Sequence, residues 1–235
     1  MGNPPARKSL KSRRLRPVSR RFFNRDPREV AGELLGKVLV RRDGQELLSG
    51  RIVELEAYLG EDDPAAHAFA GSTERNRVLF GPPGHAYIYF IYGNYYCLNV
   101  SCMPEGQAGS ILIRALEPLT GLDAMLRQRG LLAGKTKPIM PSRKIQRLLT
   151  SGPGRLAEAM GITRTRDNGK DLTTDASDLW IADDGFKPKQ LDVTPRIGIS
   201  KATEMPLRYL IAENEFVSRQ PRTKRVSPQK SARRS

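Results

Sequence analysis

The sequence predicts a single globular domain of mixed helices and strands, flanked by two basic tails. The chain has 235 residues, of which 38% are hydrophobic, and this suits one domain of ordinary size. Its 17 prolines and 21 glycines indicate many turns. The chain contains both short stretches with strand character and stretches of helical pattern.

The first elements predicted are a helix and a hairpin. Asp26-Pro27-Arg28-Glu29 is typical of a helix start, with Asp at the N-cap and Glu placed for a capping box. Gly36 marks the end of that helix. Strands are predicted over 37–42 and 46–58, joined by Asp43-Gly44, a pair that favours a hairpin turn. Residues 59–84 follow as a long loop, and loops of that length are often functional.

A second hairpin is predicted from two apolar, tyrosine-rich arms, 86–91 and 95–100, with Tyr92-Gly93-Asn94 at its turn. The remaining predicted elements are a strand over 110–116, helices near 120–130, 142–150 and 153–160, and strands over 191–200 and 206–212. No internal repeat interrupts this order, so the elements predict one domain.

The net charge of +15 lies at the two ends of the chain. Residues 1–21 hold eight basic residues and residues 218–235 hold seven, with no acid in either, so 22–217 has 25 basic and 25 acidic residues. Both ends are rich in Ser, Pro and Arg, which predicts disordered tails that attract phosphates without reading a base sequence. The alternative is that the tails serve solubility alone.

Charge is also uneven within the domain. Residues 127–166 carry ten basic residues and one acid, whereas 167–192 carry seven acids and three lysines. The first block is either a phosphate-facing surface or an ordinary solvated helical face.

Cysteine content and hydropathy argue against two other classes of protein. Cys97 and Cys102 are the only cysteines, so no disulfide framework is expected and a reducing cytosol is indicated. No apolar run reaches the ~18 residues that a membrane-spanning helix needs. The basic N-terminus is not followed by an apolar segment, so no secretory signal is predicted.

The segment Arg51–Tyr58 is the strongest candidate for a site. Side chains alternate along a strand, so Glu54, Glu56 and Tyr58 share one face. Carboxylates in an apolar strand usually have either partners or chemistry to perform, which suggests a general base. The alternative is that one carboxylate is paired with a buried arginine, for which Arg114 is a candidate.

A metal site is a further hypothesis from this part of the chain. Its possible donors are Glu54, Glu56, Glu61, Asp62, Asp63 and His67. Their spacing matches no ligand motif, and a polar loop is the simpler interpretation, so no metal is expected. His67 is either a hydrogen-bonded polar residue or part of the site, and His85 is interpreted as structural.

Five of the seven tyrosines lie within ten residues, at positions 87, 89, 92, 95 and 96. They are either core and cross-strand pairs or a surface on which bases stack, with the hairpin tip as a wedge between base steps. Asn99, in the same apolar hairpin, either makes polar packing contacts or lines a pocket.

Several motifs now stand in order: Glu-x-Glu-Ala-Tyr, Ala-Ala-His, Arg-Asn-Arg, Tyr-x-Tyr-x-x-Tyr-Gly-x-Tyr-x-Cys-x-Asn, Ile-Arg-Ala-Leu-Glu-Pro-Leu and Ser-Gly-Pro. Together they resemble the alkyladenine (3-methyladenine, methylpurine) DNA glycosylase family over residues 22–217. The resemblance implies a single mixed α/β (α+β) domain around a curved antiparallel sheet, with a protruding β-hairpin and peripheral helices.

The resemblance also implies a function. The chain would be a monofunctional hydrolase of base excision repair that flips a damaged purine out of duplex DNA, cuts its N-glycosidic bond and leaves an abasic site. Its substrates would be 3-methyladenine, 7-methylguanine, hypoxanthine and ethenoadenine. The strand that carries the carboxylates has no lysine, so a Schiff-base lyase step lacks an obvious nucleophile there.

The resemblance assigns roles to individual residues. Glu56 would be the general base that activates water, and Arg114 and the backbone carbonyl of Ile197 would help to hold that water. Tyr58, His67 and Tyr89 would sandwich the base, with His67 also hydrogen-bonding it.

Further roles concern selectivity and DNA contact. Asn99 would exclude normal guanine by crowding its 2-amino group, and Tyr92 would fill the gap that the flipped base leaves. The remaining DNA contacts would come from Arg75, Arg77, Asn94 and Tyr95. Asn94 is polar where the family is expected to have an apolar residue.

The expected partner is duplex DNA that contains damaged purines, with no cofactor, no metal and no membrane. The protein would act as a monomer, in the nucleoid-associated cytoplasm of a bacterium or in the nucleus of a eukaryote. Two alternatives are a non-catalytic nucleic-acid binding module driven by the basic tails and a metal-dependent nuclease that uses the acidic loop.

Overall fold

The computed structural model describes residues 15–91, 93, 95–132 and 141–218. The strands in these residues are β1 (Arg16–Pro17), β2 (Val38–Asp43), β3 (Glu46–Tyr58), β4 (Ala86–Ile91), β5 (Tyr95–Ser101), β6 (Ser110–Thr120), β7 (Leu179–Asp183), β8 (Leu191–Thr194) and β9 (Arg208–Ile211). All of them join one antiparallel sheet in the order β1-β7-β2-β3-β6-β5-β4, with β9 paired to β3 and β8 to β9. The predicted mixed fold around an antiparallel sheet is therefore confirmed.

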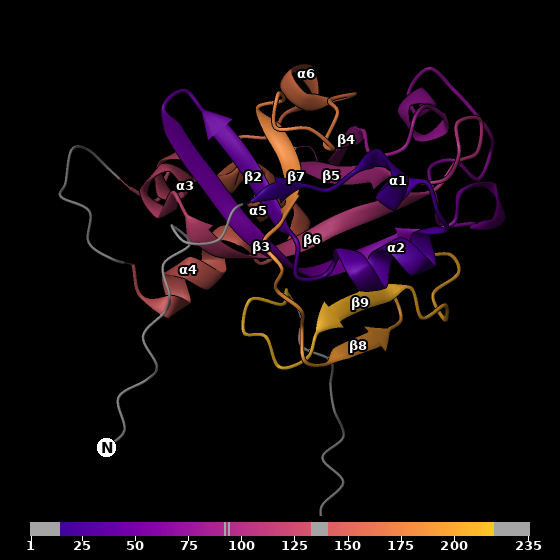
Figure 1. Cartoon of the computed structure of the whole chain (residues 1–235). Helices are drawn as coiled ribbons and strands as arrows, with labels where there is room; N and C mark the ends of the chain where they lie inside the picture. The colour runs from indigo at the N-terminus through magenta and orange to yellow at the C-terminus, as the bar shows by residue number, and fades with distance from the viewer. Residues whose placement is uncertain (1–14, 92, 94, 133–140, 219–235) are drawn as a thin grey trace, which may run out of the picture.

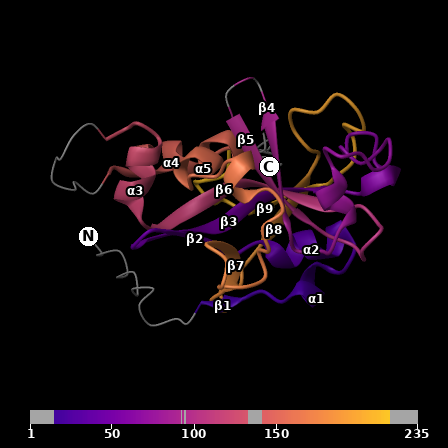
Figure 2. The same cartoon turned by 90° about the horizontal axis from the view of Figure 1, so that it is seen from above.

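Short helices surround this sheet: α1 (Arg20–Phe23), α2 (Pro27–Leu34), α3 (Leu122–Gln128), α4 (Arg143–Thr150), α5 (Pro153–Ala159), α6 (Arg164–Asp167), and the 3-10 turns η2 (Gly60–Asp62) and η3 (Arg77–Phe80). In Figure 2, α3, α4 and α5 lie together on one side of β3 and β6, and α2 lies on the other side. The main core contains buried side chains from both groups of helices and from the sheet. Among the described residues, no helix is long and apolar enough to cross a membrane.

The local signals in the sequence correspond to the observed ends of elements. The carboxylate of Asp26 accepts a hydrogen bond from the backbone N–H of Arg28 at 2.7 Å, which caps α2. Gly36 follows that helix with φ of +87°, a conformation that glycine adopts without strain. Gly44 has φ of +59° in the turn between β2 and β3, as the predicted hairpin requires.

Strand β3 changes its partner along its length, and this places the carboxylates. Its first half pairs with β2 up to Arg51, and its second half pairs with β9 from Glu54 to Glu56, while β6 runs along its other edge. The register against β6 shifts between Ile52 and Glu54 and again between Glu54 and Leu55. Such bulges re-aim side chains and often lie next to active sites. The register of β3 therefore shifts in the part of the strand that carries the two carboxylates.

The hairpin formed by β4 and β5 projects from the body of the protein (Figure 2). β4 is the last strand of the sheet and pairs only with β5, so the far end of the hairpin has no further strand beside it. The predicted protruding hairpin is thus present, although Tyr92 and Asn94 lie outside the described residues.

Some elements were missed by sequence reasoning. β7 lies inside the acid-rich block 167–192, whose charge hid its short apolar core, Leu179-Trp180-Ile181. α1, α6 and β1 are each four residues or fewer, too short for a periodic pattern. The strand predicted over 191–200 ends at Thr194, because Pro195 has no N–H to donate to a ladder.

The predicted tail boundaries also need correction. Within 1–21, Arg16 and Pro17 pair with β7, and Val18 is buried. Ser218, predicted as the first tail residue, is hydrogen-bonded to Glu54. The rest of the predicted tails, 1–14 and 219–235, lies outside the described residues.

Candidate active site

Glu54 and Glu56 are joined by one arginine, Arg114. Its Nε lies 3.0 Å from Oε1 of Glu54, and its Nη1 lies 3.2 Å from Oε2 of Glu56. Glu54 pairs with Ala115 and Leu55 with Ile113, so Arg114 is the extra residue of the bulge in β6. The bulge turns the Arg114 side chain towards the carboxylates, which confirms Arg114 as the buried partner that the sequence suggested.

Glu54 is a fully buried structural centre. Besides Arg114, its oxygens accept hydrogen bonds from Nε of Arg208 at 2.8 Å and from the backbone N–H and hydroxyl of Ser218 at 2.6 and 2.9 Å. Burial alone would raise the pKa of Glu54, but Arg114 and Arg208 outweigh it and hold that pKa below its ordinary value. With so many protein donors, Glu54 is committed to ion pairing.

Glu56 is also fully buried, but its three donors are all parts of the candidate site. Oε2 accepts from the hydroxyl of Tyr58 at 3.0 Å and from Arg114, and Oε1 accepts from the backbone N–H of Ile197 at 2.9 Å. Burial and the nearby Glu56 raise the pKa of Tyr58, so its hydroxyl stays protonated and acts as the donor. The bond seen at Ile197 involves its N–H, and the role assigned to its carbonyl stays a prediction.

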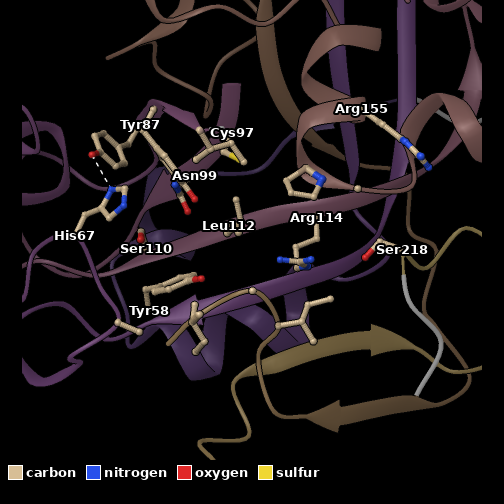
Figure 3. A pocket seen from close by; sticks show the side chains of 18 of the residues that line it. Tyr58, His67, Tyr87, Cys97, Asn99, Ser110, Leu112, Arg114, Arg155 and Ser218 are labelled. Atoms are coloured by element: carbon tan, nitrogen blue, oxygen red, sulfur yellow. Dashed lines mark hydrogen bonds between the residues drawn. The ribbon is translucent and has the colours of Figure 1, made fainter. Parts of the chain in front are cut away.

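A cavity of about 510 Å³ opens above this group (Figure 3). Glu56 is not part of its lining, but the three residues that donate to Glu56, namely Tyr58, Arg114 and Ile197, all are. Nine of its 20 lining residues come from the strands β3, β4, β5 and β6. The others come from the loop after β3, from η3, from the segment that leads into the first turn of α5, from the 197–199 loop and from Ser218. The volume is typical of sites for small organic groups.

Aromatic rings gather at the end of the cavity where Tyr58 and His67 are drawn (Figure 3). The ring centroids of His67 and Tyr89 are 4.4 Å apart at 69°, and those of Tyr87 and Tyr89 are 5.7 Å apart and nearly parallel. His67 Nδ1 and the Tyr87 hydroxyl share a hydrogen bond of 3.0 Å. The three predicted walls, Tyr58, His67 and Tyr89, therefore do line one cavity, together with Tyr87.

The protonation states of the cavity wall follow from burial. Burial, with a contribution from Arg75, lowers the pKa of His67, so its ring is uncharged at neutral pH. Burial raises the pKa of Cys97 to about 11, so this thiol of the lining is protonated and unreactive. Asn99 is buried and lines the cavity, which resolves its two sequence interpretations in favour of the pocket.

Three of the predicted DNA contacts, Arg75, Arg77 and Tyr95, belong to the described residues, and none of the three lines the cavity. Arg75 interacts electrostatically with His67 and Tyr87, while Arg77 is exposed and paired with Glu74 at 3.1 Å. Tyr95 packs its ring on the first turn of α5, where a Cβ at Gly154 would lie 2.8 Å from the ring. Tyr92 and Asn94 are outside the described residues.

The possible metal ligands are dispersed in the structure. Both oxygens of Asp63 are bound by Arg196, and Glu61 and Asp62 are exposed on η2. In the described part of the chain, no three His, Cys, Asp or Glu side chains stand close enough to share a metal ion.

Sequence reasoning missed three polar residues near the carboxylates, Arg196, Arg208 and Ser218, and it considered Asp63 only as a possible metal ligand. The best available signal was Arg208, a single cation within the apolar run Leu207–Ile211, where burial requires a partner. Nothing in the sequence indicated which carboxylate that partner would be.

A buried carboxylate and arginine beside a cavity walled by aromatic rings define a hydrolase class. The rings suit a flat heteroaromatic group, and the carboxylate suits cleavage of the glycosidic bond attached to it. This is the arrangement expected of a DNA glycosylase.

The chain belongs to the methylpurine-DNA glycosylase family, whose model matches residues 21–215. A relative from Koribacter versatilis is 60% identical over 204 residues, which are 87% of this chain and 94% of the relative. Relatives from Burkholderia cenocepacia and Methanoculleus marisnigri are 46% and 42% identical over 86% and 84% of this chain, and over 90% and 96% of their own lengths. Each of the three is named "Putative 3-methyladenine DNA glycosylase".

Proposed function

We propose that this chain excises damaged purines from duplex DNA by hydrolysing the bond between base and deoxyribose, which leaves an abasic site. The proposed substrates are 3-methyladenine, 7-methylguanine, hypoxanthine and ethenoadenine. The observation that carries the proposal is the joining of Glu56, through Tyr58 and Arg114, to an aromatic cavity of about 510 Å³.

Access of the base to this cavity requires flipping, because a stacked base cannot present its glycosidic bond inside the protein. Flipping costs a few kcal/mol and is least costly for a damaged or mispaired base. The projecting hairpin supports the proposal, because its strand β4 carries Tyr89 in the cavity wall. Tyr92, the proposed wedge, falls in the sequence between β4 and β5. Arg75, Arg77, Asn94 and Tyr95 are proposed to contact the DNA around that wedge.

The proposed chemistry needs only the residues of this site. Glu56 acts as the general base for a water molecule that Arg114 and the carbonyl of Ile197 help to hold. Its negative charge also stabilises an oxocarbenium-like sugar as the bond breaks. A purine alkylated at N3 or N7 already carries a positive charge, so it leaves without a strong general acid, and aromatic walls favour such a cation.

Selectivity is proposed to come from the polar groups of the wall. Asn99 and His67 both line the cavity. Asn99 is proposed to crowd the 2-amino group of normal guanine, and His67 is proposed to hydrogen-bond the bound base. Because Nδ1 of the uncharged His67 ring is hydrogen-bonded to the Tyr87 hydroxyl, Nε2 is the nitrogen left for the base, as donor or acceptor according to the tautomer.

The test is a base-release panel on duplex oligonucleotides that each hold one lesion, with and without EDTA. We expect release of at least one alkylated or deaminated purine, undiminished by EDTA.

Glu56→Gln should slow single-turnover excision by at least about 100-fold, as expected for loss of a general base. Glu46→Gln, an exposed position on the same strand, is the matched control and should excise normally. Equal rates for Glu56→Gln and wild type would exclude Glu56 as the base, and loss of activity in EDTA would favour the nuclease alternative.

Deletion of the basic tails distinguishes the proposed glycosylase from a non-catalytic nucleic-acid binding module. Deletion of 1–14 and 219–235, which leaves all described residues in place, should weaken DNA binding most at low salt. Single-turnover excision at saturating enzyme should stay near normal. A binding module would instead show a steep salt dependence and no base release. Sedimentation of the full chain would test the proposed monomer.

A further inference from the structure

The ion pair between Arg196 and Asp63 joins two loops near Tyr58. Arg196 Nη1 lies 2.5 Å from Oδ2 of Asp63 and Nη2 lies 2.8 Å from Oδ1, so the contact is bidentate. Both side chains are completely excluded from solvent. The pair thus connects the loop that follows β3, which leads to His67, with the loop between β8 and β9, which contains Ile197.

Arg196 also contacts the cavity wall and borders the catalytic group. Its guanidinium carbon lies 4.6 Å from the centre of the Tyr58 ring, and its Nη1 donates to the carbonyl of Ala57 at 3.1 Å. The next residue along the chain, Ile197, donates its N–H to Glu56. The guanidinium of Arg196 therefore lies against Tyr58, and the residue next to Arg196 in the chain donates to Glu56.

Asp63 extends the same connection towards His67. Its Oδ2 accepts from the backbone N–H of Leu59 at 3.2 Å, and its Oδ1 accepts from that of Ala65 at 3.1 Å. These bonds shape the turn that leaves Tyr58 and continues to His67. Burial alone would raise the pKa of Asp63, but the hydrogen bonds from Arg196 and Ala65 outweigh it and keep the carboxylate charged.

We infer that Arg196, held by Asp63, is a positioning residue. It keeps the Tyr58 ring in place as a wall for the base and keeps the N–H of Ile197 directed at Glu56. The inference rests on the proposed function for its kinetic consequences. The planar guanidinium makes two parallel bonds in a fixed orientation, which a lysine cannot reproduce. A buried ion pair is weak evidence for stability, because apolar replacements are often equally stable. The ion pair matters here because it fixes a geometry: a displacement of catalytic groups by about 1 Å can slow a reaction by up to about 100-fold.

The protein contains a matched control pair at a distance from the cavity. Arg51 donates to Asp184 at 3.1 and 2.9 Å and to the carbonyl of Gly36 at 2.6 Å, and its guanidinium lies 4.0 Å from the Phe186 ring. This repeats the contacts of Arg196: a bidentate aspartate, a backbone carbonyl and an aromatic ring. None of these four residues lines the cavity.

The experiment compares Arg196→Met and Arg196→Lys with Arg51→Met in the full chain, at a temperature at which circular dichroism shows all of them folded. We expect Arg196→Met to lower the single-turnover excision rate by about 10- to 100-fold, with Arg196→Lys intermediate. Affinity for undamaged duplex should be unchanged in both. Arg51→Met should excise at the wild-type rate, even if its melting temperature falls as far as that of Arg196→Met.

Hydrogen exchange of the Ile197 amide supplies a readout that does not depend on activity. Its exchange should become faster in Arg196→Met and stay slow in Arg51→Met. An unchanged rate and an unchanged Ile197 amide in folded Arg196→Met would overturn the inference, and so would an equal loss of rate in Arg51→Met. If the wild-type protein releases no base, the proposed function fails, and the amide measurement alone then decides the inference.

Discussion

The hydroxyl of Tyr58 donates a hydrogen bond of 3.0 Å to Oε2 of Glu56, so a wall of the cavity and the buried carboxylate are directly joined. The two residues are neighbours on one face of β3, and the bond closes across that face. Substrate contact with the ring can therefore affect the orientation of the carboxylate.

The roles of the Tyr58 ring and hydroxyl can be separated by substitution. Tyr58→Phe keeps the ring but removes a hydrogen bond to a charged group, a loss of about 1.5–3 kcal/mol. We expect a roughly 10- to 100-fold slower single-turnover rate with nearly unchanged affinity for lesion-containing DNA. Tyr58→Leu should also weaken that affinity, because base stacking on an aromatic ring contributes about 1–3 kcal/mol. Equal affinity losses in both variants would show that the ring does not stack on the base.

Glu54→Gln should destabilise the fold more than any surface carboxylate substitution. Removing one partner of a buried ion pair costs about 3–5 kcal/mol, and here Arg114 and Arg208 both lose charge compensation. Glu46→Gln, at an exposed pair with Arg127, should cost less than about 1 kcal/mol. Urea unfolding of both variants measures the difference. A small loss in Glu54→Gln would show that the network tolerates an uncharged centre.

The lowered pKa of Glu54 also predicts how the stability of the protein changes in acid. Since the pKa of Glu54 in the folded protein is lowered from about 4.5, its stabilisation is present above pH 4.5 and is lost as the pH falls through the lower folded value. The free energy of unfolding of the wild type should therefore fall with decreasing pH below about 4.5. The slope should be shallower in Glu54→Gln, and equal slopes would exclude Glu54 as a source of the acid sensitivity.

His67 should remain uncharged throughout the neutral range. Its pKa is lowered from 6.5, chiefly by burial and further by Arg75, so the unfolded chain binds its proton first and protonation opposes folding as the pH falls below 6.5. NMR titration can follow its ring directly, because the chain has only two histidines. Arg75→Gln should move the midpoint upwards by a fraction of a pH unit. No movement would show that Arg75 does not act on the ring.

The contact between Gly154 and Tyr95 should govern how the projecting hairpin sits against α5. A Cβ at Gly154 would lie 2.8 Å from the ring of Tyr95, so Gly154→Ala forces the ring or the hairpin to shift. We expect excision at least about tenfold slower, in line with the cost of small displacements. Gly32→Ala in α2, where the added methyl meets no atom within 4 Å, is the control and should excise normally. Normal excision by Gly154→Ala would show that the hairpin adapts.

The local elements could largely be predicted because their signals lie within a few residues. Asp26 and Gly36 bound α2, Gly44 permits the tight turn before β3, and strand alternation puts Glu54, Glu56 and Tyr58 on one face. Arg114 and His67 were candidates from the residues alone, the family motifs gave each of them a role, and both do lie at the cavity. The short β1 and β7 escaped prediction because they are stabilised by their neighbours in the sheet and by little of their own pattern.

By itself, the sequence determined which residues share a strand face and which motifs the chain contains, since both depend on order along the chain. Only the tertiary structure decided which donors each carboxylate receives besides Arg114, namely Arg208 and Ser218 for Glu54, and Tyr58 and Ile197 for Glu56. Glu56 receives the N–H of Ile197 from 141 residues away, and Glu54 receives Ser218 from 164 residues away. Such contacts follow from sheet register and from the bulge at Arg114, which spacing in the sequence does not encode.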